Sequence, residues 1–92
     1  DDCYISFKNE IAYIIEKKFQ NSSGSVDEKL AACHFKLLEY IKLFSAIRYK
    51  TVYIFVLNDW FKRPEYRDIL DYINFMGCFY FFNEIPLNFL GL

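Results

Sequence analysis

Glu16 and Lys18 stand two residues apart near the end of a hydrophobic stretch. Residues 11–20 are predicted to form a strand, and side chains two positions apart on a strand point to the same face. A charge at the end of an otherwise buried strand is costly unless a partner compensates it. A carboxylate can hold a divalent cation, and a neighbouring ammonium can position or polarise an attacking water. The pair therefore predicts a metal-assisted hydrolytic site.

A hairpin at the start of the chain is expected to present this strand. Residues 3–7 are aromatic and β-branched, which favours a second strand. Residues 8–10 interrupt the two stretches, and Asn9 tolerates the positive φ that a tight turn needs. Two registers follow, one with a turn centred on Lys8-Asn9 and one with a turn centred on Asn9-Glu10.

The hairpin also supplies the second carboxylate that a metal site needs. Both registers place Asp1 on the face of Glu16 and Lys18, and the first places Asp1 directly opposite Glu16. A loop with an odd number of residues, or a bulge, would bring Asp2 to that face instead. Asp1 is therefore the favoured partner, and the choice between the two aspartates stays open.

The rest of the chain is predicted to alternate helices and strands. A helix should run from Ser25 to about Ser45, and residues 51–57 form the most apolar strand. Pro64 suits the first turn of a second helix, which Gly77 should end. Residues 78–82 form a final short strand. The order strand, strand, helix, strand, helix, strand predicts an α/β fold with a mixed β-sheet flanked by helices.

Each predicted helix carries an apolar face at three-and-four spacing, which should pack on the sheet. The first face comprises Leu30, Cys33 or His34, Leu37, Ile41 and Phe44, and the second comprises Tyr66, Ile69, Leu70, Ile73 and Met76.

Asp1 followed by Glu16-Lys17-Lys18 resembles the PD-(D/E)xK signature of type II restriction endonucleases and Holliday-junction resolvases. The predicted order of elements is similar to that superfamily's core, in which a hairpin bearing the Asp and the E-x-K precedes a helix and a buried strand. Further regions resemble a type II restriction endonuclease family: residues 15–20, 24–30, 57–61 and 82–87.

The resemblance implies Mg²⁺-dependent hydrolysis of phosphodiester bonds in double-stranded DNA. Asp1 and Glu16 would bind the metal, and the carbonyl of Lys17 would be a further ligand. Lys18 would orient the nucleophilic water and stabilise charge on the phosphate. Gln20, on the same face, would contact the substrate or support Lys18.

The same resemblance implies a restriction-endonuclease-like core that acts as a homodimer in a bacterial cytoplasm. Residues 1–92 would be a single domain, the C-terminal part of a nuclease catalytic core. The Pro of the motif, an N-terminal helix and a first core strand would lie upstream of Asp1.

Composition is consistent with one folded domain. The 92 residues are 54% hydrophobic and 22% aromatic, which excludes a disordered chain. No apolar run approaches the roughly 18 residues that span a bilayer. The net charge of −1 lacks the basic excess of a dedicated nucleic-acid-binding domain but allows a local basic cluster.

Three cysteines, Cys3, Cys33 and Cys78, form neither a disulfide framework nor a paired zinc motif. We expect them to be buried free thiols in a reducing cytoplasm. His34 is the only histidine, so a histidine-based triad cannot be built within the chain. A structural role for His34 is therefore expected.

Two other interpretations remain. In the first, the chain is a non-catalytic α/β binding module with a nuclease-like fold, and Glu16 and Lys18 form a surface ion pair of little energetic value. In the second, it is a different α/β interaction domain in which Asp59 happens to follow the central strand. Asp59 is then expected to cap the turn that follows it.

Overall fold

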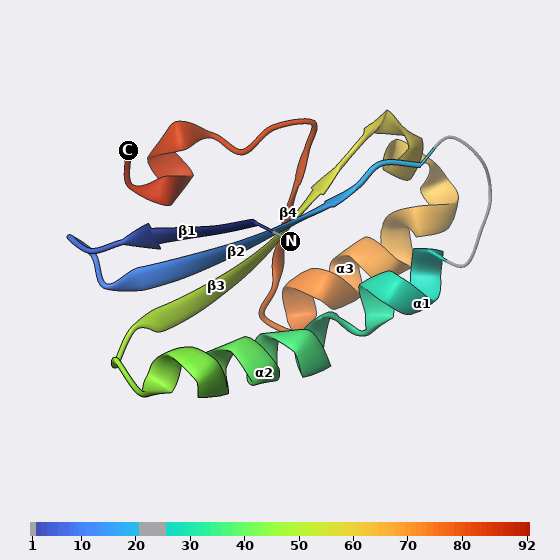
Figure 1. Ribbon diagram of the computed structural model, residues 1–92. Coiled ribbons are helices and arrows are strands. Elements are labelled where there is room, and N and C mark those ends of the chain that lie inside the picture. Colours follow the sequence, from blue (N-terminus) through green and yellow to red (C-terminus); the bar gives the residue numbers. More distant parts are fainter. Residues whose placement is uncertain (1, 21–25) are drawn as a thin grey trace.

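The computed structural model describes residues 2–20 and 26–92. They include a four-stranded mixed sheet whose strands lie in sequence order (Figure 1). Strand β1 is antiparallel to β2, whereas β2, β3 and β4 run parallel. The predicted mixed sheet is confirmed. Its strands span Asp2–Ser6 (β1), Ile11–Lys18 (β2), Lys50–Leu57 (β3) and Phe79–Phe82 (β4).

The register of the hairpin is the first of the two that the sequence predicts. Asp2 lies opposite Ile15, and Ser6 lies opposite Ile11. The turn between the strands is closed by a hydrogen bond from the Asn9 amide to Oγ of Ser6, at 3.3 Å. The positive φ falls on Glu10 (φ 56°) and not on Asn9 as expected.

The predicted first helix is two helices, α1 (Val26–Ala31) and α2 (Cys33–Ser45). Its expected start at Ser25 lies outside the described residues. The break falls at Ala32, whose ψ of 2° departs from helical geometry. The two segments pack on different partners, because α1 lies against α3 (Arg67–Phe75) and α2 lies against β3. None of the helices in the described part of the chain is long and apolar enough to cross a membrane.

Short 3₁₀ helices connect the remaining elements. η1 (Asp59–Lys62) follows β3, and η2 (Pro64–Tyr66) leads into α3, so Pro64 does open a helical segment. Gly77, at φ 86°, follows α3 as predicted. η3 (Leu87–Leu90) lies in the C-terminal segment.

The helices cover one face of the sheet, and the C-terminal segment lies on the other (Figure 1). Phe89 of η3 packs edge-on against Tyr13, Phe79 and Phe81, with ring centroids 4.8–6.4 Å apart. The central strand β3 is accordingly buried over its last five residues. The core on the helix side comprises Ile14, Leu30, Cys33, Leu37, Tyr53, Phe55, Leu57, Phe61, Tyr66, Leu70, Ile73 and Cys78.

The predicted apolar face of the first helix is correct in part. Leu30, Cys33 and Leu37 are buried, but Ile41 is 42% exposed, and the ring of Tyr40 packs against Tyr53 with centroids 6.0 Å apart. The predicted face of α3 is confirmed, since all five of its residues are buried or pack against the core.

Candidate functional site

Glu16 is the buried acidic residue of the sheet, with 5% of its surface exposed. It lies near the end of β2 on the helix-covered face, together with Ile14 and Lys18, because alternate residues share a face. Phe55 of β3 lies directly opposite it. Burying a carboxylate among such neighbours is unfavourable unless hydrogen-bond donors surround it.

Three donors from three elements meet the Glu16 carboxylate. Its Oε1 accepts from Nζ of Lys18 at 3.0 Å and from Nζ of Lys36, on α2, at 3.2 Å. Its Oε2 accepts from the hydroxyl of Tyr53, on β3. In the part of the chain that the structure describes, no buried side-chain nitrogen or oxygen lacks a partner. We call Glu16, Lys18, Lys36 and Tyr53 the Glu16 cluster.

The contacts of the cluster shift the pKa values of Glu16 and Tyr53. Burial alone raises the pKa of Glu16, but the hydrogen bonds from Tyr53, Lys18 and Lys36 outweigh it and hold the pKa below the ordinary value of 4.5. Burial, and then the adjacent carboxylate, raise the pKa of Tyr53 well above its usual range. At neutral pH a charged carboxylate therefore accepts from a neutral phenol and two ammonium groups.

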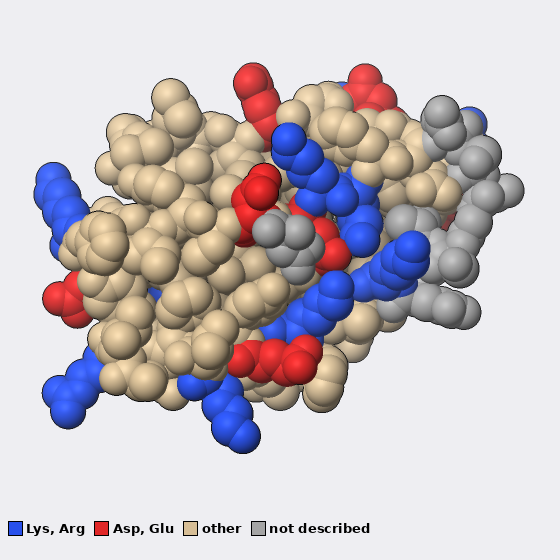
Figure 2. All heavy atoms as spheres, in the orientation of Figure 1, with Lys and Arg blue, Asp and Glu red and all other residues tan. Residues whose placement is uncertain are grey.

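The positive end of the cluster reaches solvent. The side chains of Lys18 and Lys36 are 23% and 37% exposed, whereas that of Glu16 is 6% exposed. Lys and Arg side chains gather beside acidic ones near the middle of the face that Figure 2 shows. Two ammonium groups on one carboxylate leave the cluster with a surplus positive charge, which suits an anionic substrate such as a phosphodiester.

The structure brings together two of the predicted site residues, Glu16 and Lys18. Asp1 lies outside the described residues. Asp2 pairs with Ile15, so the register puts it on the opposite face, away from Glu16. The Lys17 side chain is exposed on that opposite face, and only its carbonyl was expected to act as a ligand.

Gln20 follows the end of β2 and is held by Asn58, at the end of β3. Oδ1 of Asn58 accepts from the Gln20 amide at 3.1 Å, and Nδ2 of Asn58 donates to the Gln20 carbonyl at 2.6 Å. These two hydrogen bonds tie the carboxyl ends of neighbouring parallel strands together. Asn58 therefore positions the chain that leaves the Glu16 cluster.

Sequence reasoning missed Lys36 and Tyr53. Lys36 adjoins the buried Leu37 on α2, and a lysine at the border of an apolar face is a weak indication of a buried anion nearby. Tyr53 carries a hydroxyl group in the middle of an almost wholly apolar strand, and a buried tyrosine hydroxyl usually finds a partner.

The oxygen donors of this site suit Mg²⁺ in chemistry. Mg²⁺ takes hard oxygen ligands and is commonly held by one or two carboxylates together with substrate phosphates. Glu16 supplies one carboxylate, and its Oε1 already accepts two cationic groups. Among the described residues, no three His, Cys, Asp or Glu side chains converge on one point, and the role of Asp1 as the second carboxylate stays a prediction.

The other polar candidates have structural partners. Nδ1 of His34 lies 3.4 Å from the Met76 carbonyl, in line with the expected structural role. Asp59 is exposed, accepts from Asn83 at 2.9 Å and pairs with Lys62 at 3.1 Å. The side chain of Asn58, at the start of η1, forms no capping hydrogen bond, and the expected capping by Asp59 stays a prediction.

Two of the three cysteines are buried free thiols, as predicted, whereas Cys3 is exposed.

No protein-family model, curated protein or solved structure matches the chain. The resemblance to PD-(D/E)xK nucleases therefore stays a prediction, and the case for function depends on the geometry of the Glu16 cluster.

Proposed function

We propose that this protein is a Mg²⁺-dependent endonuclease that hydrolyses phosphodiester bonds of double-stranded DNA, with the Glu16 cluster as its catalytic centre. One observation carries the proposal. A buried glutamate bonds at 3.0 Å to the lysine two residues later, near the end of a strand in an antiparallel hairpin. Helices and a parallel strand follow, which is the order of elements expected for a restriction-endonuclease-like core.

Glu16 would hold the metal together with Asp1 and the Lys17 carbonyl. A bound Mg²⁺ supplies Lewis-acid activation of the phosphate and offsets its negative charge. The Tyr53 hydroxyl fixes Oε2 of Glu16, so the orientation of the carboxylate is set by the neighbouring strand. Such support of a ligand by a second layer of hydrogen bonds is typical of metal sites.

Lys18 would orient the attacking water and stabilise the charge that develops on the phosphate. Its ammonium shares Oε1 of Glu16 with that of Lys36, and both side chains are partly exposed. Both ammonium groups can therefore turn to phosphate oxygens when substrate arrives. Gln20, beyond the end of the same strand, would contact the DNA or support Lys18.

The remaining parts of the proposal follow from the resemblance. A homodimer would present two centres, one for each strand of the duplex. The enzyme would act in a bacterial cytoplasm as part of a restriction system.

Cleavage of mixed-sequence plasmid DNA tests the proposal. The protein should convert supercoiled plasmid to discrete products in Mg²⁺ and not in EDTA, and Glu16→Gln and Lys18→Ala should abolish cutting. Glu84→Gln and Lys42→Ala, which change exposed residues, are the matched controls and should cut normally. Equal cutting by all five proteins would place the reaction elsewhere, and no cutting of DNA that carries many recognition sequences would contradict the proposal.

A non-catalytic α/β binding module is the second candidate. The observation that favours it is the saturation of Glu16, whose two oxygens already accept from three donors, as in a structural ion-pair cluster. In that case Glu16→Gln would lower the free energy of unfolding, and no Mg²⁺-dependent cleavage would be found in either protein.

A further inference from the structure

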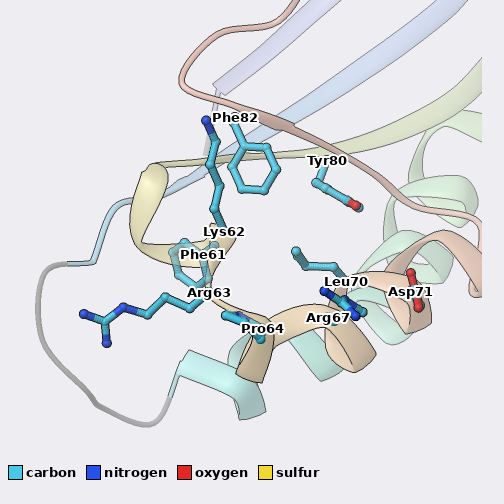
Figure 3. Close-up of a pocket in the computed structure, with 9 residues that line it drawn as sticks. All are labelled: Phe61, Lys62, Arg63, Pro64, Arg67, Leu70, Asp71, Tyr80 and Phe82. Atoms are coloured by element: carbon cyan, nitrogen blue, oxygen red, sulfur yellow. The ribbon is translucent and has the colours of Figure 1, made fainter.

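A hollow of about 220 Å³ lies between η1, α3 and β4 (Figure 3). Phe61, Leu70, Tyr80 and Phe82 surround it, and Figure 3 shows Arg63 extending away from it. It is smaller than the roughly 300–1,000 Å³ of pockets that take drug-sized ligands. Its size therefore suits one ring system, such as the base or sugar of a nucleotide whose phosphate lies at the rim. We call it the basic pocket, because Lys62, Arg63 and Arg67 line it.

The rim of the pocket is positively charged. Lys62, Arg63 and Arg67 line it, against one acidic residue, Asp71. Lys62 pairs with Asp59 at 3.1 Å, but both side chains are more than half exposed, and such pairs contribute little. Arg67 is exposed and forms no ion pair with any residue that the structure describes. A phosphate would therefore find two accessible cations, Lys62 and Arg67, at little cost.

The wall of the pocket is aromatic. Tyr80 and Phe82 are partly buried, with ring centroids 5.7 Å apart, and the Lys62 ammonium lies 5.3 Å from the centroid of the Phe82 ring. Aromatic side chains beside cations are the combination that takes nucleotides, because the rings accept a base or sugar and the cations accept the phosphate.

The sheet places the basic pocket beside the Glu16 cluster. Lys18 pairs with Leu57, and Leu57 pairs with Phe82, so Lys18 and Phe82 stand in one row on the same face, two strands apart. Neighbouring strands are about 4.8 Å apart, which gives about 10 Å between the two backbones. That separation is short enough for one DNA strand to contact both sites.

We propose that the basic pocket binds one nucleotide of the DNA strand close to the scissile phosphate. Arg67 and Lys62 contact its phosphate, and Tyr80 and Phe82 contact its sugar or base. This assignment depends on the proposed nuclease function, which makes DNA the ligand. A free nucleotide presents the same chemistry, so the test compares DNA with a free nucleotide.

Binding without turnover tests the assignment. Fluorescence anisotropy of labelled duplex DNA in EDTA would be measured against salt concentration for the wild type, Arg67→Gln and the exposed control Lys42→Gln. We expect Arg67→Gln to weaken binding about tenfold and to reduce the slope of log K against log salt by about 1, since one phosphate contact is lost. Lys42→Gln should match the wild type. Equal affinity and slope for Arg67→Gln and wild type would overturn the proposal.

Competition by a deoxynucleoside monophosphate shows whether the pocket binds DNA or a free nucleotide. The strand contact predicts that the unlabelled mononucleotide competes only weakly, whereas unlabelled DNA competes fully. Tight binding of the mononucleotide that is lost in Arg67→Gln, with DNA binding unchanged, would contradict a DNA contact. If DNA binding depends on Arg67 but no cleavage occurs, only the proposed nuclease function is overturned. If the protein cleaves DNA but its DNA binding does not depend on Arg67, only the assignment of the pocket is overturned.

Discussion

The hydroxyl of Tyr53, on β3, donates a hydrogen bond to Oε2 of Glu16, on the adjacent strand β2. Tyr53 is fully buried, so this donor is neutral and fixed in place. Oε1 of the same carboxylate faces the two partly exposed lysines of the cluster. One oxygen of Glu16 is thus held by a buried donor of the fold, and the other is held by two cations that reach solvent.

Tyr53→Phe should destabilise the protein and raise the pKa of Glu16. Removing the hydroxyl leaves a buried carboxylate with one donor fewer, and a hydrogen bond to a charged group contributes about 1.5–3 kcal/mol. We expect a loss of that size in the free energy of unfolding in urea. Tyr72→Phe, at a position 40% exposed, is the control and should change it little. An unaltered unfolding curve for Tyr53→Phe would show that the hydrogen bond contributes nothing.

Stability should fall with acidification through Glu16. Because its pKa is lower in the folded protein than the ordinary 4.5, its contribution is present above that value and is lost as the pH falls through the folded pKa. Glu16→Gln lacks this contribution. The free energy of unfolding of the wild type should therefore decline more steeply below about pH 4.5 than that of Glu16→Gln.

Asp59→Asn serves as the control for the acid titration. Hydrogen bonds from Asn83 and Lys62 also lower the pKa of Asp59, but its carboxylate is exposed. Its removal should leave most of the acid dependence in place. A wild-type profile parallel to that of Glu16→Gln would mean that the cluster does not hold the carboxylate in its charged form.

Lys36→Ala should slow DNA cleavage less than Lys18→Ala. Both ammonium groups contact Oε1 of Glu16, but Lys36 comes from α2, is more exposed and lies slightly farther away, at 3.2 Å. We expect kcat/KM to fall about tenfold, mainly through KM, as for loss of a phosphate contact. Lys42→Ala, on the same helix, is the control. A loss for Lys36→Ala as large as that for Lys18→Ala would assign Lys36 a direct part in the chemical step.

The three thiols should react with Ellman's reagent in two classes. Cys3 is exposed, whereas Cys33 and Cys78 are buried, and burial raises the pKa of the Cys78 thiol to about 12. One thiol of the native protein should react quickly, and the other two should react only in denaturant. Cys3→Ser should remove the fast phase. Three fast equivalents in the native protein would contradict the burial of Cys33 and Cys78.

Local patterns were sufficient to predict the four strands and to narrow the hairpin to two registers. The hairpin and the central strand follow from short apolar, β-branched stretches separated by turn residues, and the register depends only on where the turn is centred. The break at Ala32 could not be predicted in this way, because the apolar spacing continues through it. It arises from tertiary packing, since α1 lies on α3 and α2 lies on β3.

Only the part of the candidate site that lies on one strand could be predicted from the sequence. Alternation along β2 puts Glu16 and Lys18 on one face without knowledge of the rest of the fold. Lys36 and Tyr53 are 20 and 37 residues from Glu16, so their contacts depend on how α2 and β3 are placed. Nothing in the local sequence specifies that placement.

The most direct test of the account is a double-mutant cycle on single-turnover cleavage of duplex DNA in Mg²⁺. The rates of the wild type, Glu16→Gln, Lys18→Gln and the double variant would be compared, with circular dichroism to verify folding. Groups that act as one catalytic unit are strongly non-additive. We expect each single variant to lose at least about 100-fold and the double variant to lose no more than the worse of the two. Wild-type rates in Glu16→Gln, or losses that simply multiply in the double variant, would contradict a shared catalytic role for Glu16 and Lys18.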